Sequence, residues 1–152
     1  YDHPFLWGSK RTGPDLLREG QKYNDNWHFN HFWSPQSISA GSIMPSYRWL
    51  FNNKAMDVSL TEKKMKAMAS LGVPYSEAEI ANAQQSMRTQ ATAIENSLKN
   101  DPDFVKSYDE SKKKALAKGE VFVPMNEREI VAMIAYIQRL GTDIKVKNNT
   151  KK

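Results

Sequence analysis

The residues best suited to metal or acid–base chemistry lie in the first third of the chain. The sequence has three histidines, His3, His28 and His31, and no cysteine. His28 and His31 are three residues apart, a spacing that puts both rings on one face of a helix. Two imidazoles could serve a metal site, but a third ligand would have to come from elsewhere. We therefore favour an interpretation in which one ring packs among the neighbouring aromatic residues and the other faces water.

Other kinds of chemistry have less support. The lack of cysteine excludes disulfides, thiolate metal sites, cysteine nucleophiles and haem thioether bonds within these 152 residues. No Gly-x-Ser-x-Gly elbow or phosphate-binding loop occurs. Asp15 and Glu19 are four residues apart, yet nothing nearby predicts the unequal environments that paired catalytic carboxylates need.

The net charge of +5 makes a nucleic-acid partner worth weighing. The lysines alternate with acidic residues along the predicted helices, which is typical of a solvated face. We therefore predict no nucleic-acid partner. Binding to generic DNA with a steep salt dependence would revive this weaker alternative.

Two short segments are more specific in combination. The first is Arg11-Thr-Gly-Pro-Asp-Leu16, and the second is Ser42-Ile-Met-Pro-Ser-Tyr47, with Trp49 close behind. The Met44 thioether could fill a core, or it could be a soft axial ligand that raises the reduction potential of a haem iron. The Pro14 carbonyl could accept a hydrogen bond from an axial histidine ring and so orient that ring.

Helices must position these segments. Residues 1–53 contain all four tryptophans and all three histidines, and their turn formers predict irregular chain with short helical turns. Such turns are expected after Pro14 and Ser34, and in a helix capped by Asp25. Residues 54–152 show helical periodicity, and strand signals are almost absent, so we predict an all-α fold.

Local signals divide the second part of the chain. Capping boxes at Ser59/Glu62 and Ser76/Glu79 predict two helix starts, and Asn100-Asp-Pro102 predicts a break before a weaker third helix. Val121–Pro124 is expected to be an extended link. Asn126 is expected to cap a last helix whose apolar face runs from Ile130 to Leu140, and Gly141 is its predicted stop.

In combination, these segments resemble a class I cytochrome c. The likeness is closest to the mono-haem cytochrome c subunit (subunit II) of cbb3-type cytochrome c oxidases. The segments that carry it span nearly the whole chain: residues 1–16, Trp27-His28-x-x-His31, Ser42–Trp49, Met65–Gln84 and Glu129–Gly141 with Tyr136. The resemblance implies one cytochrome c-like domain over residues 1–145, with a helical insert at 54–120 before the last helix, and a basic tail at 146–152.

The resemblance also implies a function. Such a subunit has an N-terminal membrane anchor, and its globular domain lies on the periplasmic side of the bacterial inner membrane. Its haem c passes electrons, together with other cytochrome c subunits, towards the haem–copper catalytic subunit. Met44 corresponds to the axial iron ligand and Pro14 to the orienting carbonyl. Arg11, Tyr47 and Trp49 are candidates for contacts with the haem propionates, and Leu16 for the haem-facing wall.

The sequence departs from this family at one essential point. It contains neither the Cys-x-x-Cys-His motif nor the membrane helix that should precede Tyr1. We therefore expect a shortened subunit that holds no haem by itself, whose uncovered apolar wall favours self-association. The alternative is a haem-less interaction or assembly module of an oxidase complex.

Overall fold

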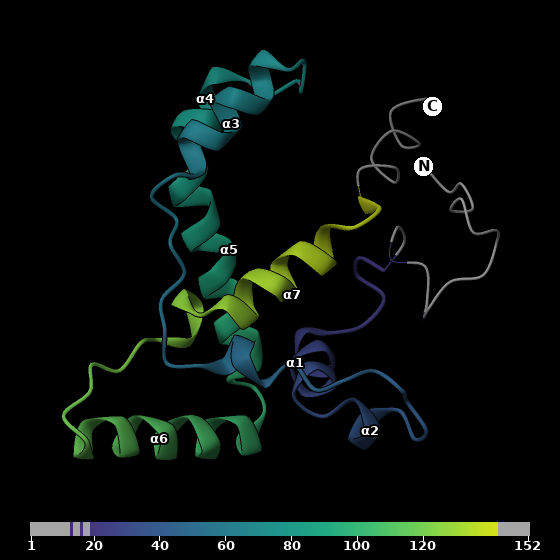
Figure 1. The fold of residues 1–152 in the computed structure, drawn as a ribbon, viewed down its shortest axis with the longest axis vertical. Coiled ribbons are helices and arrows are strands. Elements are labelled where there is room, and N and C mark those ends of the chain that lie inside the picture. The colour runs from purple at the N-terminus through teal and green to yellow at the C-terminus, as the bar shows by residue number, and fades with distance from the viewer. Residues whose placement is uncertain (1–12, 14–15, 17–18, 143–152) are drawn as a thin grey trace. The chain divides into compact units, whose positions relative to one another are not determined.

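The computed structural model describes Gly13, Leu16 and residues 19–142 (Figure 1). The described residues are helical and form no strand, with a single isolated bridge between Ala55 and Arg128. This confirms the predicted all-α fold. The helices are α1 Asp25–Trp33, α2 Pro35–Ile38, η2 Arg48–Phe51, α3 Thr61–Ser70, α4 Glu77–Ala81, α5 Ala83–Leu98, α6 Pro102–Ala117, η3 Met125–Glu127 and α7 Glu129–Arg139.

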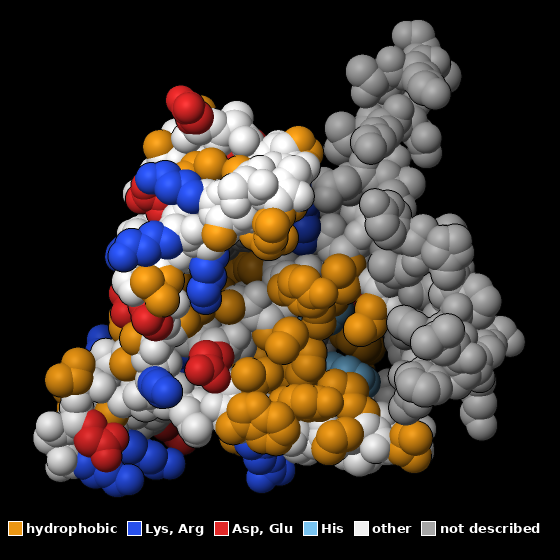
Figure 2. Space-filling view, turned by 45° about the horizontal axis from the view of Figure 1, so that its top comes forward, with side chains coloured by type: hydrophobic (Ala, Val, Ile, Leu, Met, Phe, Trp, Pro, Cys, Tyr) orange, Lys and Arg blue, Asp and Glu red, His pale blue; other side chains and the backbone are white. Residues whose placement is uncertain are grey.

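The chain divides into two compact units. Unit 1 comprises Tyr1–Ser46 and Met133–Lys152, and unit 2 comprises Tyr47–Ala132. None of the helices in the described ranges is both long and apolar enough to cross a bilayer. On the face drawn in Figure 2, basic and acidic side chains are interspersed, so neither sign forms an unbroken field there.

In unit 1, α1 begins one residue earlier than the sequence predicted. The cap is Asn24, whose side-chain oxygen accepts a hydrogen bond from the Trp27 N–H at 2.7 Å. Asp25 is the first helical residue, and its carboxylate accepts a bond from Gln138. The predicted Asp25 cap was therefore wrong, because asparagine caps equally well and Asp25 has a tertiary partner. Pro35 opens α2, as expected after Ser34.

Unit 1 consists of two segments that are far apart in the sequence, and hydrogen bonds join them. Gly20 N–H donates to the Leu140 carbonyl at 3.0 Å. The Gln138 side chain accepts from Gln21 N–H and donates to the Tyr23 carbonyl, both at 2.9 Å. A Cβ on Gly20 would collide with the carbonyl oxygen of Leu140, so only glycine fits there. The end of α7 thus holds the segment that leads into α1.

In unit 2, α3 and α4 both contact each other and α5 (Figure 1). The buried face of α5 includes Ala91, Ile94 and Leu98, in agreement with the predicted stripe, while Met87 is only half-buried. The single helix expected from Ser76 is broken at Asn82, whose side chain donates to the Ala78 carbonyl at 3.0 Å. Such a bond competes with the helical backbone pattern and explains the break.

The capping boxes had different outcomes. The Ser76/Glu79 box is present in both directions, so that prediction is confirmed. The Ser59/Glu62 box was wrong: Leu60 is the N-cap of α3 and makes no side-chain cap bond. Ser59 N–H instead donates to the Asp57 carboxylate at 2.9 Å, and Glu62 pairs with Lys66 at 2.7 Å. In a capping box the Ser59 N–H would donate to the Glu62 carboxylate, but here each of these two groups has another partner nearby in the sequence.

The third helix and the link after it follow the sequence closely. Asp101 caps α6 by accepting from the Asp103 and Phe104 N–H groups. Phe104 and Ala115 are buried in α6, whereas Leu116 is 60% exposed. The extended link is present without pairing as a strand, and the Val121 carbonyl accepts a bond from Asn53 at 2.9 Å.

Asn126 does not cap the last helix. It lies within η3, its amide donates to Thr92 at 3.4 Å, and its buried side-chain oxygen accepts no bond. The 3₁₀ turn places Asn126 too far ahead of α7 to satisfy that helix. The apolar face of α7 is as predicted, with Ile130 and Ile134 fully buried, and Gly141 follows with a φ of 74°.

Candidate functional site

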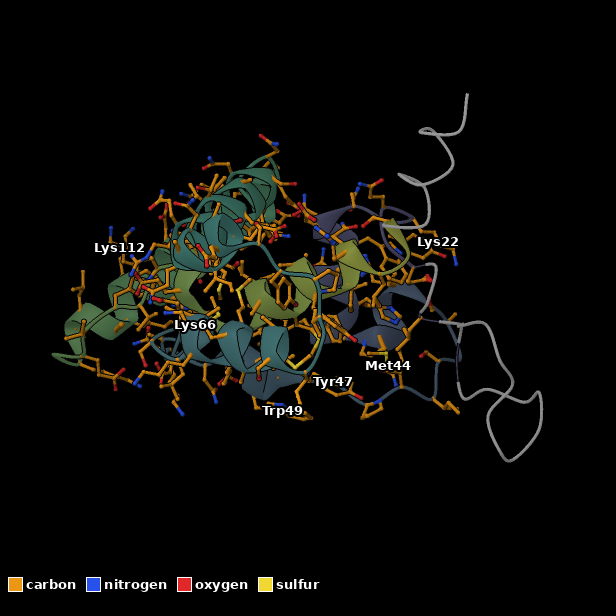
Figure 3. All side chains as sticks on the ribbon, turned by 90° about the horizontal axis from the view of Figure 1, so that it is seen from above. Lys22, Met44, Tyr47, Trp49, Lys66 and Lys112 are labelled. Carbon is orange, nitrogen blue, oxygen red and sulfur yellow. The ribbon has the colours of Figure 1, made fainter. Side chains whose placement is uncertain are left out.

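Met44 lies in an irregular loop that is tied to α2 in unit 1. Ser42 N–H donates to the Ser39 carbonyl at 3.0 Å, and the Gln36 amide donates to the Ser42 carbonyl at 3.2 Å. The Ser42 hydroxyl accepts from the Met44 N–H at 3.2 Å. Met44 is half-buried, whereas its neighbour Ile43 is 89% exposed. The loop therefore fixes the backbone of Met44, whose side chain is labelled in Figure 3.

Tyr47 and Trp49 follow at the start of unit 2. Their ring centroids are 4.9 Å apart and the rings are tilted by 54°. Trp49 belongs to η2 and is 54% exposed, while Tyr47 is half-buried (Figure 3). The structure thus brings these two predicted site residues together. The Tyr47 and Trp49 rings therefore form an aromatic pair in which the indole is exposed to solvent.

The remaining predicted site residues lie near the start of the chain. Arg11 and Pro14 fall outside the described residues. Leu16 is 55% exposed, and its carbonyl accepts a bond from Glu19 N–H at 3.3 Å, which closes a turn. Glu19 is 6% exposed and pairs with Lys22 at 3.0 Å. Sequence reasoning considered Glu19 only as a partner of Asp15 and missed its pairing with Lys22, although their spacing of three residues was a usable signal.

The two histidines of α1 sit in an aromatic cluster. Trp27 stacks on Tyr23 with centroids 3.9 Å apart and on His31 with centroids 4.4 Å apart. The His28 ring meets Trp27 edge-on at 5.2 Å and is only 3% exposed. The prediction that one ring packs among aromatics is confirmed for His28. His31 is half-buried against Trp27 and does not simply face water.

Burial sets the protonation of His28 and His31. Loss of hydration lowers the pKa of His28, and the nearby charges of Asp25 and Glu19 oppose this only in part. Burial also lowers the pKa of His31. His28 Nε2 and His31 Nδ1 are buried and have no hydrogen-bond partner. Among the described residues, no group of three or more His, Cys, Asp or Glu side chains could hold a metal ion.

The chain was compared with models of known protein families. The family model described as "Cytochrome C oxidase, mono-heme subunit/FixO" matches residues 1–144, which is nearly the whole chain. No curated protein matches the sequence significantly. The match covers both the Met44 loop and the pair of Tyr47 and Trp49, and it extends through α7.

Proposed function

This chain belongs to the mono-haem subunit family of cytochrome c oxidase, and from that premise we propose that Met44 is the axial thioether ligand of a haem c. Family membership makes the chain a cytochrome c subunit of a cbb3-type oxidase, with a role in respiratory electron transport. The observation that supports a role for Met44 is its half-buried side chain in a loop whose backbone is held by Ser42 and Gln36.

The donor set fits one side of a haem iron. A thioether is a soft ligand and stabilises the reduced iron, so it raises the potential at which the haem, when bound, exchanges one electron. The Ser42 hydroxyl holds the Met44 backbone, which limits where the sulfur can go. The thioether bonds need cysteine, and this sequence contains none. We therefore assign these bonds, together with the histidine ligand of the Cys-x-x-Cys-His motif, to residues outside this sequence. These 152 residues by themselves then hold no haem c covalently.

The other predicted site residues are assigned supporting roles. Arg11 and the polar edges of Tyr47 and Trp49 are suited to donate hydrogen bonds to haem propionates. The Pro14 carbonyl is suited to accept from the axial histidine ring and thereby to orient it. Leu16 supplies apolar surface beside the haem, and its 55% exposure is consistent with a side chain that a cofactor would cover.

We place this domain on the periplasmic side of the bacterial inner membrane. There, electrons would pass through it, with the other cytochrome c subunits, towards the haem–copper subunit. Helices α3 to α6 fall within the 54–120 range that the sequence assigned to an insert. They present no metal-ligating cluster among their described residues, which supports a structural or docking role for them.

The test is an exchange of the sulfur ligand in the haem-loaded oxidase that contains this subunit. Met44→His should lower the midpoint potential of the haem c by a sizeable part of the ~0.8 V range that axial ligands span. Met87→Leu, which alters a half-buried methionine on α5, should leave that potential unchanged. An unchanged potential in Met44→His would show that another residue binds the iron.

A haem-less interaction module is the second candidate. The exposure of Trp49 in unit 2, which is more than half open to solvent, favours it because exposed apolar side chains can bind a protein partner. In that case the subunit purified with its oxidase would show no haem c absorption. The isolated chain would then also self-associate through the exposed Trp49 side chain, and Trp49→Ser would return it to a monomer.

A further inference from the structure

Helix α3 has two apolar faces, and only one of them is covered. Met65 and Ala69 are half-buried on one side of α3, and the helix contacts α4 and α5. The opposite side carries an outer stripe made of Leu60, Lys64, Met68 and Leu71. Their spacing of four, four and three residues aligns them along one side of the helix. Of the apolar members, Leu60 is 45% exposed, Met68 46% and Leu71 80%.

The exposed end of this stripe is held in a defined conformation. Gly72 has a φ of 92° and follows the last residues of α3. Its N–H donates to the Ala69 carbonyl at 3.0 Å, and the next N–H, that of Val73, donates to the Met68 carbonyl at 3.1 Å. This pair of bonds is a Schellman motif, which fixes the helix end. The outward position of Leu71 is thus built into the backbone and does not arise from fraying.

Positive charge accompanies the apolar side chains. Lys63 and Lys64 are exposed on α3, and the Lys66 ammonium group pairs with the Glu62 carboxylate at 2.7 Å. Tyr75, which is 39% exposed, follows the Schellman turn. Exposed leucine and methionine, with adjacent lysines and a tyrosine, form the composition that binds at the interface of a membrane.

We propose that the outer stripe of α3 binds the surface of an anionic phospholipid membrane. Met68 and Leu71 insert between the headgroups, and Lys63 and Lys64 contact lipid phosphates. Lys64 lies within the stripe, and its long aliphatic stem can follow the apolar surface while the ammonium group reaches a phosphate. This inference does not depend on the ligand role of Met44.

Lys64 also disfavours two other partners for the outer stripe, namely a second copy of this chain and an apolar groove on another protein. In a two-fold pairing of identical stripes, Lys64 would approach its own copy, and like charges without compensation oppose contact. An apolar groove on a protein partner would bury the Lys64 ammonium group, and that costs free energy unless a carboxylate pairs with it. A lipid surface supplies both the apolar interior and the negative charge.

The experiment is flotation of the 152-residue chain with lipid vesicles. We expect binding to vesicles that contain phosphatidylglycerol, weaker binding to pure phosphatidylcholine, and loss of binding as salt rises. The double variant Met68→Ser/Leu71→Ser should lower the partition coefficient at least roughly tenfold, because it removes two inserted side chains. The charge variant Lys63→Glu/Lys64→Glu should lose the preference for the anionic vesicles.

A matched control is available in the same unit. Val121→Ser changes an apolar side chain that is 85% exposed in the link after α6, and it should leave binding unchanged. Every variant keeps the basic tail at 146–152. Equal binding by the double variant would therefore assign the interaction to other parts of the chain and overturn the proposal.

Two further outcomes would also overturn it. One is the absence of vesicle binding by the unmodified chain. The other is a dimer, seen by sedimentation without lipid, that Met68→Ser/Leu71→Ser dissociates. Neither result bears on Met44, whose role is tested by the haem potential in the oxidase. Failure of the lipid proposal is thus distinguishable from failure of the proposed function.

Discussion

The two units of this protein are stabilised in different ways. Unit 1 depends on hydrogen bonds between residues more than 110 positions apart, such as those of Gln138 with Gln21 and Tyr23. Unit 2 is built mainly from amphipathic helices with local signals, such as the Ser76/Glu79 box and the Asp101 cap. Local signals can be read from sequence, whereas the long-range contacts emerge only when the chain is folded.

Arg128 is the most buried of the residues that make long-range hydrogen bonds through their side chains within the described part of unit 2. It is 4% exposed, and its guanidinium donates to the Val123 carbonyl at 2.9 and 3.0 Å and to the Phe51 carbonyl at 3.3 Å. Its charged group also lies 5.0 Å from the centre of the Phe122 ring. Burial lowers the pKa of Arg128, yet the group stays charged at any physiological pH. One buried cation thus links the end of η2 to the extended segment that follows α6.

The largest expected effect on this contrast between long-range and local stabilisation is at Gly20 in unit 1. Gly20→Ala should lower the free energy of unfolding by about 3 kcal/mol, because the new Cβ meets the backbone oxygens of Leu140 and Gln138. Gly72→Ala in unit 2 meets no atom within 4 Å and should cost about 1–2 kcal/mol for its positive φ alone. Denaturant unfolding measures both. Equal losses would mean that the close approach of Gly20 to α7 is not important.

Arg128 is the corresponding site in unit 2. Arg128→Met keeps most of the aliphatic bulk but removes the donors to the Phe51 and Val123 carbonyls, so we expect a loss of about 2–3 kcal/mol. Arg88→Met, at an exposed position of α5, should change stability by less than about 0.5 kcal/mol. Thermal unfolding of the two variants provides the comparison. A small loss in Arg128→Met would show that water replaces the guanidinium.

His28 should make unit 1 sensitive to acid. Burial lowers its pKa in the folded state below the value of about 6.5 expected for an unfolded chain. The unfolded chain therefore takes up the proton first, and stability falls as the pH drops below about 6.5, by at most about 1.4 kcal/mol per pH unit for this group. His28→Leu should flatten that slope in stability curves recorded from pH 7 to pH 5.

The pH dependence of stability assigned to His28 needs a control, because burial also lowers the pKa of His31. His31 is only half-buried, so His31→Leu should remove a smaller part of the pH dependence. If the two variants flattened the curve equally, the greater burial of His28 would not be what makes this unit sensitive to acid.

The smallest expected effect is the difference in stability lost when serine is replaced in the capping box that is present and in the predicted box that is not. Ser76→Ala removes a hydroxyl that accepts from the Glu79 N–H, and it should cost about 1 kcal/mol. The same change at Ser59 should cost less, because the Ser59 hydroxyl does not cap α3. It donates to the exposed Asp57 carboxylate, to which the backbone N–H that alanine retains also donates. Urea unfolding of the two variants gives the difference. Equal costs would mean that the Ser59 hydroxyl supports α3 in some other way.

Sequence reasoning succeeded where neighbouring residues decide the outcome. The break at Pro102, the apolar face of α7 and the stop at Gly141 each depend on a few adjacent residues, and the structure has them as predicted. It failed where a side chain had a choice of partners. Asp25 pairs with Gln138, and Asn126 lies in a 3₁₀ turn, so neither acts as the expected cap.

The candidate site shows the same division. Residue types and spacing marked Met44, Tyr47 and Trp49 as candidates, because a thioether beside proline and closely spaced aromatic residues are visible in the sequence. They could not give the tilted contact between Tyr47 and Trp49, nor the hydrogen bonds that hold the Met44 loop to α2. These depend on backbone geometry that the residue spacing does not specify.

The sequence by itself determined the helical class of this protein, its family resemblance and several of its helix boundaries, because periodicity, caps and breakers act within a few residues. Only the tertiary structure decided that Gly20 must approach Leu140, that Arg128 is buried among carbonyl groups and that α3 leaves an outer stripe uncovered. Those outcomes depend on which distant segments meet, and free energy from burial and long-range hydrogen bonds selects among arrangements that local pattern leaves open.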